Sequence, residues 1–125
     1  MATFQEIADG KYVSLTTFKK DGTPVATPLW GARDGDRLVL WTTADSWKVK
    51  RIKRNPKVTI APCTARGKIE GDAVDGVAEI LDAAGTEKAR SAITSKYGII
   101  GWLTVKGSSL RRGKSGTVGI SVVHA

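Results

Sequence analysis

Alternating apolar and polar residues along most of the chain predict a protein built mainly of β-strands. In residues 11–19, Val13, Leu15 and Thr17 face one side and the residues between them face the other, as in a strand with one buried face. The same period of two, bounded by turn residues, recurs further along the chain. The six strands expected are residues 11–19, 24–32, 37–42, 57–64, 72–81 and 117–123. Strands of this length joined mostly by hairpins indicate a closed or partly closed antiparallel barrel.

Two helices are marked by their start signals. Thr3 followed by Glu6 matches a capping box, which predicts a short helix over residues 3–9. Ser46 is expected to cap a second helix, which ends before Pro56 because the residue ahead of a proline disfavours helical geometry. Two short helices would plug or flank the barrel.

A third helix is expected over residues 86–97, where apolar residues recur at helical spacing. Its expected buried stripe is Ala89, Ala92, Ile93 and Tyr97. Residues 99–106 fit neither helix nor strand, and the glycine-rich stretch 107–116 is expected to be a mobile loop. No linker or repeat divides the chain, so residues 1–125 are expected to form one domain.

Proline content and aromatic placement leave several readings open. Pro24 and Pro28 remove two backbone donors from the strand 24–32, which indicates an edge, a bulge or a face next to a ligand. Trp30 and Trp41 fall in strands and are interpreted as core or interface aromatics. Trp47 is expected to cover the mouth of the barrel, with stacking on a ligand as the alternative. Trp102 would cover a cleft or a subunit contact.

Composition limits the classes of function. A chain of 125 residues with 41% apolar and 26% charged residues is typical of a folded soluble domain. No apolar run approaches the roughly 20 residues that cross a bilayer, and no signal peptide is present, so a cytoplasmic protein is expected. The net charge of +8 favours an anionic partner: nucleic acid, anionic lipid, or a phosphorylated or carboxylated small molecule.

The side chains that usually carry catalysis are scarce. The only cysteine, Cys63, lies in a strand-like run and is interpreted as a small buried hydrophobe. With it, the only histidine, His124, cannot build a metal site of the usual kinds, and no glycine-rich phosphate motif is present. No catalytic side chain is therefore predicted. If the protein is an enzyme, a bound cofactor supplies the reactivity.

One segment predicts an anion site. The strand that ends in Thr42 and Thr43 leads through Ser46 into a helix with Lys48 in its first turn. A helix start offers unpaired N–H groups and partial positive charge, which suit a phosphate. Lys48 opposes the helix dipole there unless an anion binds. A solvated basic face is the competing interpretation. The basic residues of this segment are Lys48, Lys50, Arg51, Lys53, Arg54 and Lys57.

Several runs of sequence together resemble a known family. They are the opening YVSLTTFKKDGTPVATPLW, the segment LVLWTTADSWKVKRIKRNPKVTIAPC with the ARG that follows, the tripeptide KYG at residues 96–98, and the closing strand. Over residues 12–123 the chain resembles the pyridoxamine-5′-phosphate-oxidase-like split β-barrels. Within them it is similar to the short actinobacterial flavin/deazaflavin oxidoreductases assigned to coenzyme F420. The resemblance implies a six-stranded antiparallel split β-barrel, forming a homodimer with two cofactor clefts between subunits.

The resemblance also implies a set of cofactor-binding residues. The strand 26–30 would lie along the tricyclic ring, with the main chain near its polar edge. The phosphate would be held at the strand-to-helix junction, and Arg51 with neighbouring basic side chains would accommodate the acidic tail of F420. The implied residues are Thr27, Pro28, Leu29, Thr42, Thr43, Ser46, Trp47, Lys48 and Arg51. FMN is the alternative cofactor.

The resemblance predicts an F420-dependent oxidoreductase that transfers a hydride between the deazaflavin and an unsaturated organic small molecule. The alternatives are an FMN-dependent reductase or oxidase, a protein that binds F420 or flavin without turnover, and, most distantly, a nucleic-acid-binding β-barrel. Nucleic acid is not expected, because the aromatic residues gather with the core rather than along a basic face. Oxidation of pyridoxamine phosphate is not expected either, because the chain lacks the C-terminal arginine and histidine pattern of that oxidase.

Overall fold

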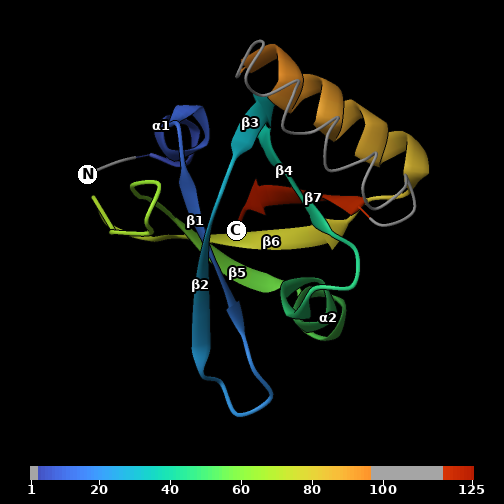
Figure 1. Ribbon diagram of the computed structural model, residues 1–125. Helices are drawn as coiled ribbons and strands as arrows, with labels where there is room; N and C mark the ends of the chain where they lie inside the picture. The colour runs from blue at the N-terminus through green and yellow to red at the C-terminus, as the bar shows by residue number, and fades with distance from the viewer. Residues whose placement is uncertain (1–2, 97–116) are drawn as a thin grey trace.

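The computed structural model describes residues 3–96 and 117–125 as a curled antiparallel sheet with helices around it (Figure 1). The strands follow the order β2-β1-β5-β6-β7-β4-β3, and each neighbouring pair is antiparallel. The elements are α1 (Phe4–Asp9), β1 (Val13–Phe18), β2 (Pro24–Leu29), β3 (Gly31–Asp34), β4 (Arg37–Thr43), α2 (Trp47–Arg54), β5 (Lys57–Pro62), β6 (Val74–Ile80), a helix over residues 83–96, and β7 (Thr117–His124). The predicted mainly-β barrel fold is confirmed.

The two edge strands of the sheet are consecutive in the chain, so the curled sheet turns back on itself. β2 and β3 are the first and last strands in the sheet order, yet only Trp30 separates them in sequence. Consecutive Cα atoms are about 3.8 Å apart, so the two edges must meet. The predicted strand 24–32 is therefore present but bends at Trp30 into β2 and β3. Gly31 permits the bend, because a Cβ there would lie 2.8 Å from side-chain atoms of both Leu38 and Leu40.

The β1–β2 hairpin extends away from the barrel (Figure 1). Its turn is closed by a bond from Lys19 N to Thr23 O of 2.9 Å, and Gly22 has the positive φ of 88° that the turn requires. The alternation of an antiparallel ladder then places Pro24 and Pro28 at positions whose backbone points away from β1. The prolines therefore lie on the outer edge of β2, which agrees with the edge reading of the sequence.

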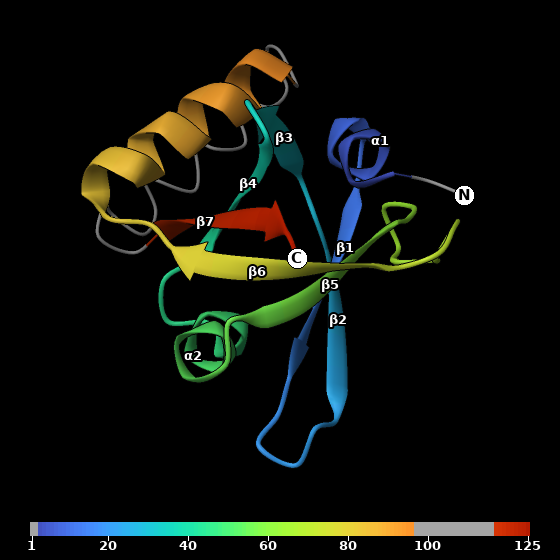
Figure 2. The same ribbon diagram turned by 180° about the vertical axis from the view of Figure 1, so that it is seen from behind.

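The interior of the barrel holds the main core. Leu38 and Leu40 of β4 point inward and are fully buried. The core consists of Phe4, Ile7, Ala8, Val13, Leu15, Leu38, Leu40, Ile52, Val58, Ile60, Ala78, Ile120 and Val122. It includes residues of both α1 and α2, which lie on opposite sides of the strands in both views (Figures 1 and 2).

A second apolar cluster covers the outer face of β4. Val39 points outward and packs with Ala89 and Ile93 of the helix 83–96, flanked by Trp30 and Trp41. This arrangement confirms the predicted helix and the core interpretation of both tryptophans. Both faces of β4 are thus covered, one by the barrel interior and one by the helix.

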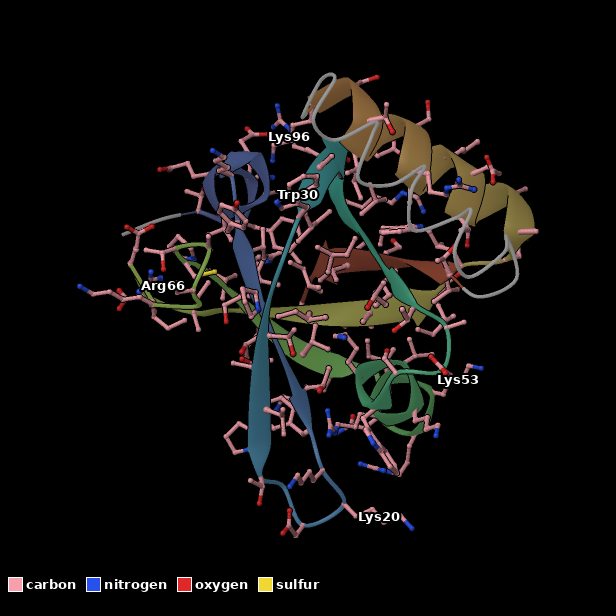
Figure 3. All side chains as sticks on the ribbon, viewed as in Figure 1. Lys20, Trp30, Lys53, Arg66 and Lys96 are labelled. Carbon is pink, nitrogen blue, oxygen red and sulfur yellow. The ribbon has the colours of Figure 1, made fainter. Side chains whose placement is uncertain are left out.

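Polar side chains at both ends of the helix 83–96 make hydrogen bonds that define its start and hold its end. It begins earlier than predicted, because Asp82 Oδ1 accepts from Gly85 N at 2.8 Å and caps its first turn. At the other end Lys96 Nζ donates to the carbonyl oxygens of Ala8, Gly10 and Gly31, at 3.0, 2.6 and 2.7 Å. Figure 3 shows Lys96 between this helix and α1. The predictions for Tyr97, Trp102 and residues 99–116 lie outside the described residues.

Candidate functional site

The junction between β4 and α2 holds a half-buried lysine beside a buried threonine. Lys48 Nζ donates to Thr42 Oγ1 at 3.2 Å. Burial lowers the pKa of Lys48, and the positive charge of Arg51 lowers it further. Both causes disfavour the ammonium form, so this cation lies where the protein alone stabilises it poorly. A bound anion would remove the conflict.

Ser46 begins α2 but does not cap it with its side chain. Its backbone has the extended geometry of an N-cap, with φ −69° and ψ 155°, and its carbonyl accepts from Lys50 N at 3.3 Å. Its hydroxyl makes no cap hydrogen bond, so the predicted side-chain cap is wrong. Its Oγ is buried and has no partner among the described residues.

The basic residues of α2 face those of the β1–β2 hairpin across an open pocket of about 470 Å³, here called the basic pocket. Its lining residues are Lys19, Lys20, Trp47, Lys50, Arg51 and Arg54. Arg54 fixes the two walls relative to each other, since its guanidinium donates to the carbonyl oxygen of Phe18 at 2.9 Å. In Figure 3, Lys20 lies at the tip of the hairpin and Lys53 on α2.

Trp47 does not cover the barrel mouth as predicted. It is 68% exposed, because Val49 and Ile52 occupy the buried face of α2 and leave Trp47 toward solvent. Lys50 Nζ lies 4.4 Å from the centre of its ring, within the range of a cation–π contact. Trp47 therefore forms part of the wall of the basic pocket, where the alternative of stacking on a ligand stays a prediction.

A second, smaller pocket lies where β2 meets β4 and is here called the aromatic pocket. It has a volume of about 240 Å³ and is lined by Tyr12, Pro28, Leu29, Trp30, Trp41, Ala65 and Ile93. Pro28 and Leu29, two residues of the predicted ring-binding strand, therefore line it, and Thr27 precedes them on β2. Trp41 is adjacent in sequence to Thr42, so the aromatic pocket and the β4–α2 junction are joined by one peptide bond.

The sequence reasoning assigned no binding role to Lys19, Lys20 or Trp41. The lysines stand in the turn of the hairpin, where a basic pair is ordinary, and only the fold brings them opposite α2. Trp41 was interpreted as core, which is correct for its packing but overlooks its indole N–H. That polar group was the one signal in the sequence that such a residue needs a partner.

The two other potentially reactive side chains, Cys63 and His124, are packed against neighbouring residues. Burial raises the pKa of the Cys63 thiol, with the charge of Glu70 adding to the effect, so its thiolate is disfavoured. His124 packs edge-on against Phe4 with ring centres 5.6 Å apart. In residues 3–96 and 117–125, no cluster of His, Cys, Asp or Glu could hold a metal ion. No helix in these ranges is long and apolar enough to cross a bilayer.

A curled, mainly β antiparallel sheet with helices around it defines the class of small split-barrel proteins. The particular family follows from the sequence profile of pyridoxamine 5′-phosphate oxidase, which matches residues 2–118. The chain belongs to this family, as the resemblance predicted, and the family's name is that of an oxidoreductase. No protein with a curated description matches the sequence.

Solved structures with the same fold carry different cofactors in their names. An F420 reductase is 20% identical, with a TM-score of 0.66 over 100% of this chain and 95% of the other. An FMN-binding, pyridoxamine 5′-phosphate oxidase-related protein of Nostoc punctiforme is 15% identical, with a TM-score of 0.63 over 91% and 70%. The heme storage protein HutZ of Vibrio cholerae is 13% identical, with a TM-score of 0.71 over 97% and 87%. At these identities the likeness shows the fold.

Proposed function

We propose that this protein is an oxidoreductase that binds coenzyme F420 and acts on an unsaturated organic small molecule. The observation that carries the proposal is the β4–α2 junction, where Lys48 is desolvated beside Thr42 and the buried hydroxyl of Ser46 has no partner among the described residues. The deazaflavin supplies hydride-transfer chemistry when it is bound. The protein contributes binding, orientation and exclusion of water.

The residues at the junction fit a phosphate. The Ser46 hydroxyl and the Lys48 ammonium are donors, and Thr43 lies beside Thr42 at the end of β4. The first turn of α2 contains no acidic residue that would repel an anion. Hydrogen bonds from charged donors to a phosphate are stronger than neutral ones, and the helix start adds its partial charge. These groups would hold the phosphate of either F420 or FMN.

The basic pocket favours F420 over FMN. FMN carries one phosphate, whereas the F420 tail carries a phosphodiester followed by several glutamates. Arg51, together with Lys19 and Lys20 across the pocket, would place positive charge along such a tail. A polyanion accounts for cationic groups on two separate elements, which one phosphate bound at the junction does not require.

Two alternatives to an F420-dependent enzyme each have an observation in their favour. FMN dependence is compatible with the β4–α2 junction, because a phosphate bound there would make the same contacts whether it belongs to FMN or to F420. Binding without turnover is favoured by the described part of the aromatic pocket, in which Tyr12 is the one lining side chain with an ionisable group. We also propose that the protein acts as a homodimer, as the family resemblance implies; size-exclusion chromatography with light scattering tests this.

A titration of the cofactor-free protein with F420 and with FMN, followed by fluorescence, tests the proposal. Tighter binding of F420 supports it, and tighter binding of FMN moves the assignment to the flavin. Reduced F420 bound to the protein is then mixed with enones, quinones and tetrapyrroles. Oxidation of the cofactor in step with loss of one acceptor supports an enzyme. Tight binding without oxidation by any of them supports a cofactor-binding protein, and failure to bind either cofactor overturns the proposal.

A further inference from the structure

Lys96 ties three separate parts of the chain together through one ammonium group. Its Nζ donates to the carbonyl oxygens of Ala8 and Gly10 at the end of α1, at 3.0 and 2.6 Å. It also donates to the carbonyl oxygen of Gly31 at the start of β3, at 2.7 Å (Figure 3). An ammonium group has three N–H donors, so it can serve all three carbonyls at once. We call this set of hydrogen bonds the Lys96 clamp.

The Lys96 clamp lies between two walls of the aromatic pocket. One wall is the bend between β2 and β3, where Leu29 and Trp30 line the pocket and Gly31 follows directly. The other wall is the helix 83–96, whose Ile93 lines the pocket one turn before Lys96. The bond from Lys96 to Gly31 therefore connects the two walls and restricts how far apart they lie.

The clamp adds direction at the end of the helix that meets the pocket. Ala89 and Ile93 pack on β4 through apolar contacts, which are not directional. Near the other end, Thr86 Oγ1 accepts from Gly119 N at 3.0 Å. Thr86 precedes Ile93 by seven residues, which is about 10 Å along a helix axis. That bond fixes the start of the helix, and the Lys96 clamp fixes the end that lines the pocket.

We propose that Lys96 is a positioning residue that sets the width of the aromatic pocket and, through it, the affinity of the protein for the cofactor's ring. It acts through the main chain of Gly31 and through the helix, because a small misplacement of supporting groups weakens a site. This role rests on the proposed function, with the ring along the strand 26–30. The phosphate would be held at the β4–α2 junction by other elements, so Lys96 should affect the ring and not the phosphate.

The variant Lys96→Met tests the proposal, because methionine keeps an unbranched stem and removes the ammonium group. The tighter-binding cofactor is titrated with and without its phosphate: FMN and riboflavin, or F420 and its ring with the ribityl chain alone. Both forms should bind Lys96→Met about tenfold more weakly, so that the ratio of their affinities is kept. Ser46→Ala should weaken the phosphorylated form alone. Lys88→Met removes an exposed lysine of the same helix and should change neither affinity.

Urea denaturation of the same variants separates this role from a purely structural one. A clamp that served only the fold would lower the free energy of unfolding of Lys96→Met and leave the affinity of the folded protein for the ring unchanged. That result overturns the proposal. A loss confined to the phosphorylated form overturns it as well, because Lys96 would then act on the phosphate.

A second measurement uses the wild-type protein and decides even if Lys96→Met does not fold. A ring that binds more tightly when the clamp is formed must in turn stabilise the clamp, because coupling between two equilibria is reciprocal. Trace acetylation with acetic anhydride, followed by mass spectrometry, should therefore modify Lys96 several-fold more slowly when the phosphate-free ring compound is saturating. Lys88 should react at the same rate in both conditions. Equal rates at Lys96 with and without the ring overturn the proposal.

The outcomes separate this proposal from the proposed function. If the wild-type protein binds neither cofactor, with or without its phosphate, the proposed function and the role of Lys96 are both overturned. If the wild-type protein binds a cofactor and Lys96→Met keeps the wild-type affinity for its ring, only the role of Lys96 is overturned.

Discussion

The starts of α1 and α2 both have a hydroxyl-bearing residue at the N-cap position but differ in structure. At α1, Thr3 Oγ1 accepts from Glu6 N at 3.2 Å, and Glu6 places negative charge in the first turn. At α2, the Ser46 hydroxyl makes no cap bond, and Lys48 stands where an acid would be favourable. One helix start is satisfied by its own side chains and the other is left open. The difference supports the proposal that the start of α2 receives an anion.

The open helix start has a cost that a purely structural helix would avoid. A cation in the first turn opposes the helix dipole by roughly 0.3–1 kcal/mol, and an unmade cap sacrifices about 1 kcal/mol. Lys48 is also partly desolvated beside Arg51. Local conflicts of this kind are expected where a sequence serves a ligand rather than the fold. Five experiments test the difference, from the largest expected effect to the smallest.

Reversing the charge at Lys48 should have the largest effect. Lys48→Glu places a carboxylate beside the proposed phosphate and removes a charged donor worth about 1.5–3 kcal/mol, so cofactor affinity should fall at least ~100-fold. The cofactor-free protein should keep its free energy of unfolding within about 1 kcal/mol, because an acid suits a helix start. Fluorescence titration and urea denaturation measure the two quantities. Unchanged cofactor affinity would remove the junction from the site.

Removing the hydroxyl from each helix start should give opposite results. Ser46→Ala should weaken cofactor binding by about tenfold and leave the free energy of unfolding of the cofactor-free protein nearly unchanged, since its Oγ makes no bond there. Thr3→Ala should leave cofactor affinity unchanged and cost about 1 kcal/mol of stability through the lost cap. A stability loss in Ser46→Ala as large as in Thr3→Ala would contradict the comparison.

The lowered pKa of Lys48 predicts a dependence of binding on pH. A phosphate interacts with the ammonium form, so affinity should decline as pH rises through the lowered pKa of Lys48 toward the ordinary value of 10.5. Lys48→Arg keeps its charge and should bind with a nearly flat pH profile over that range. A decline of equal size in both proteins would exclude Lys48 as the titrating group.

The Lys48 contribution to the stability of the cofactor-free protein should rise with pH, whereas cofactor affinity should fall. Between its lowered pKa in the folded state and 10.5, Lys48 binds fewer protons folded than unfolded, so its contribution to stability rises with pH. Lys96 has a pKa lowered chiefly by burial and contributes in the same direction. Lys48→Met, compared with the wild type by urea denaturation across this window, isolates the Lys48 part as a reduced slope.

Removing the two lysines that the β1–β2 hairpin contributes to the basic pocket should have the smallest effect. Lys19→Ala combined with Lys20→Ala should weaken F420 binding about three- to tenfold, as two exposed ion pairs of roughly 0.2–1 kcal/mol each allow. FMN affinity should not change, because FMN has no acidic tail to reach the hairpin. The measurement is made at low and high salt, where the F420 effect should shrink. Equal losses for both cofactors would argue against a tail in this pocket.

Much of the fold could be predicted from the sequence. Alternation predicted a strand over residues 11–19, and β1 (Val13–Phe18) lies within it. Helical spacing placed Ala89 and Ile93 against the barrel. These predictions succeeded because side-chain periodicity is a local property of strands and helices. The β4–α2 junction was predicted in the same way, since its threonines, serine and lysine lie within one short segment.

Other features depended on contacts between distant segments. The close approach of Leu38 and Leu40 to Gly31, beside the bend at Trp30, is one that no local pattern reveals. The Ser46 hydroxyl makes no cap hydrogen bond, although the sequence predicted one. Lys19 and Lys20 line the basic pocket because the fold brings the hairpin opposite α2, where Arg54 donates to the carbonyl oxygen of Phe18.

The sequence by itself determined most of the strands and helices and the grouping of threonines, serine and lysine at the β4–α2 junction, because each depends on neighbours a few residues apart. The tertiary structure alone decided which charges share a pocket and which hydroxyl stays without a partner among the described residues. Burial and hydrogen-bond satisfaction are set by groups far apart in the chain, and closure of the barrel brings those groups together.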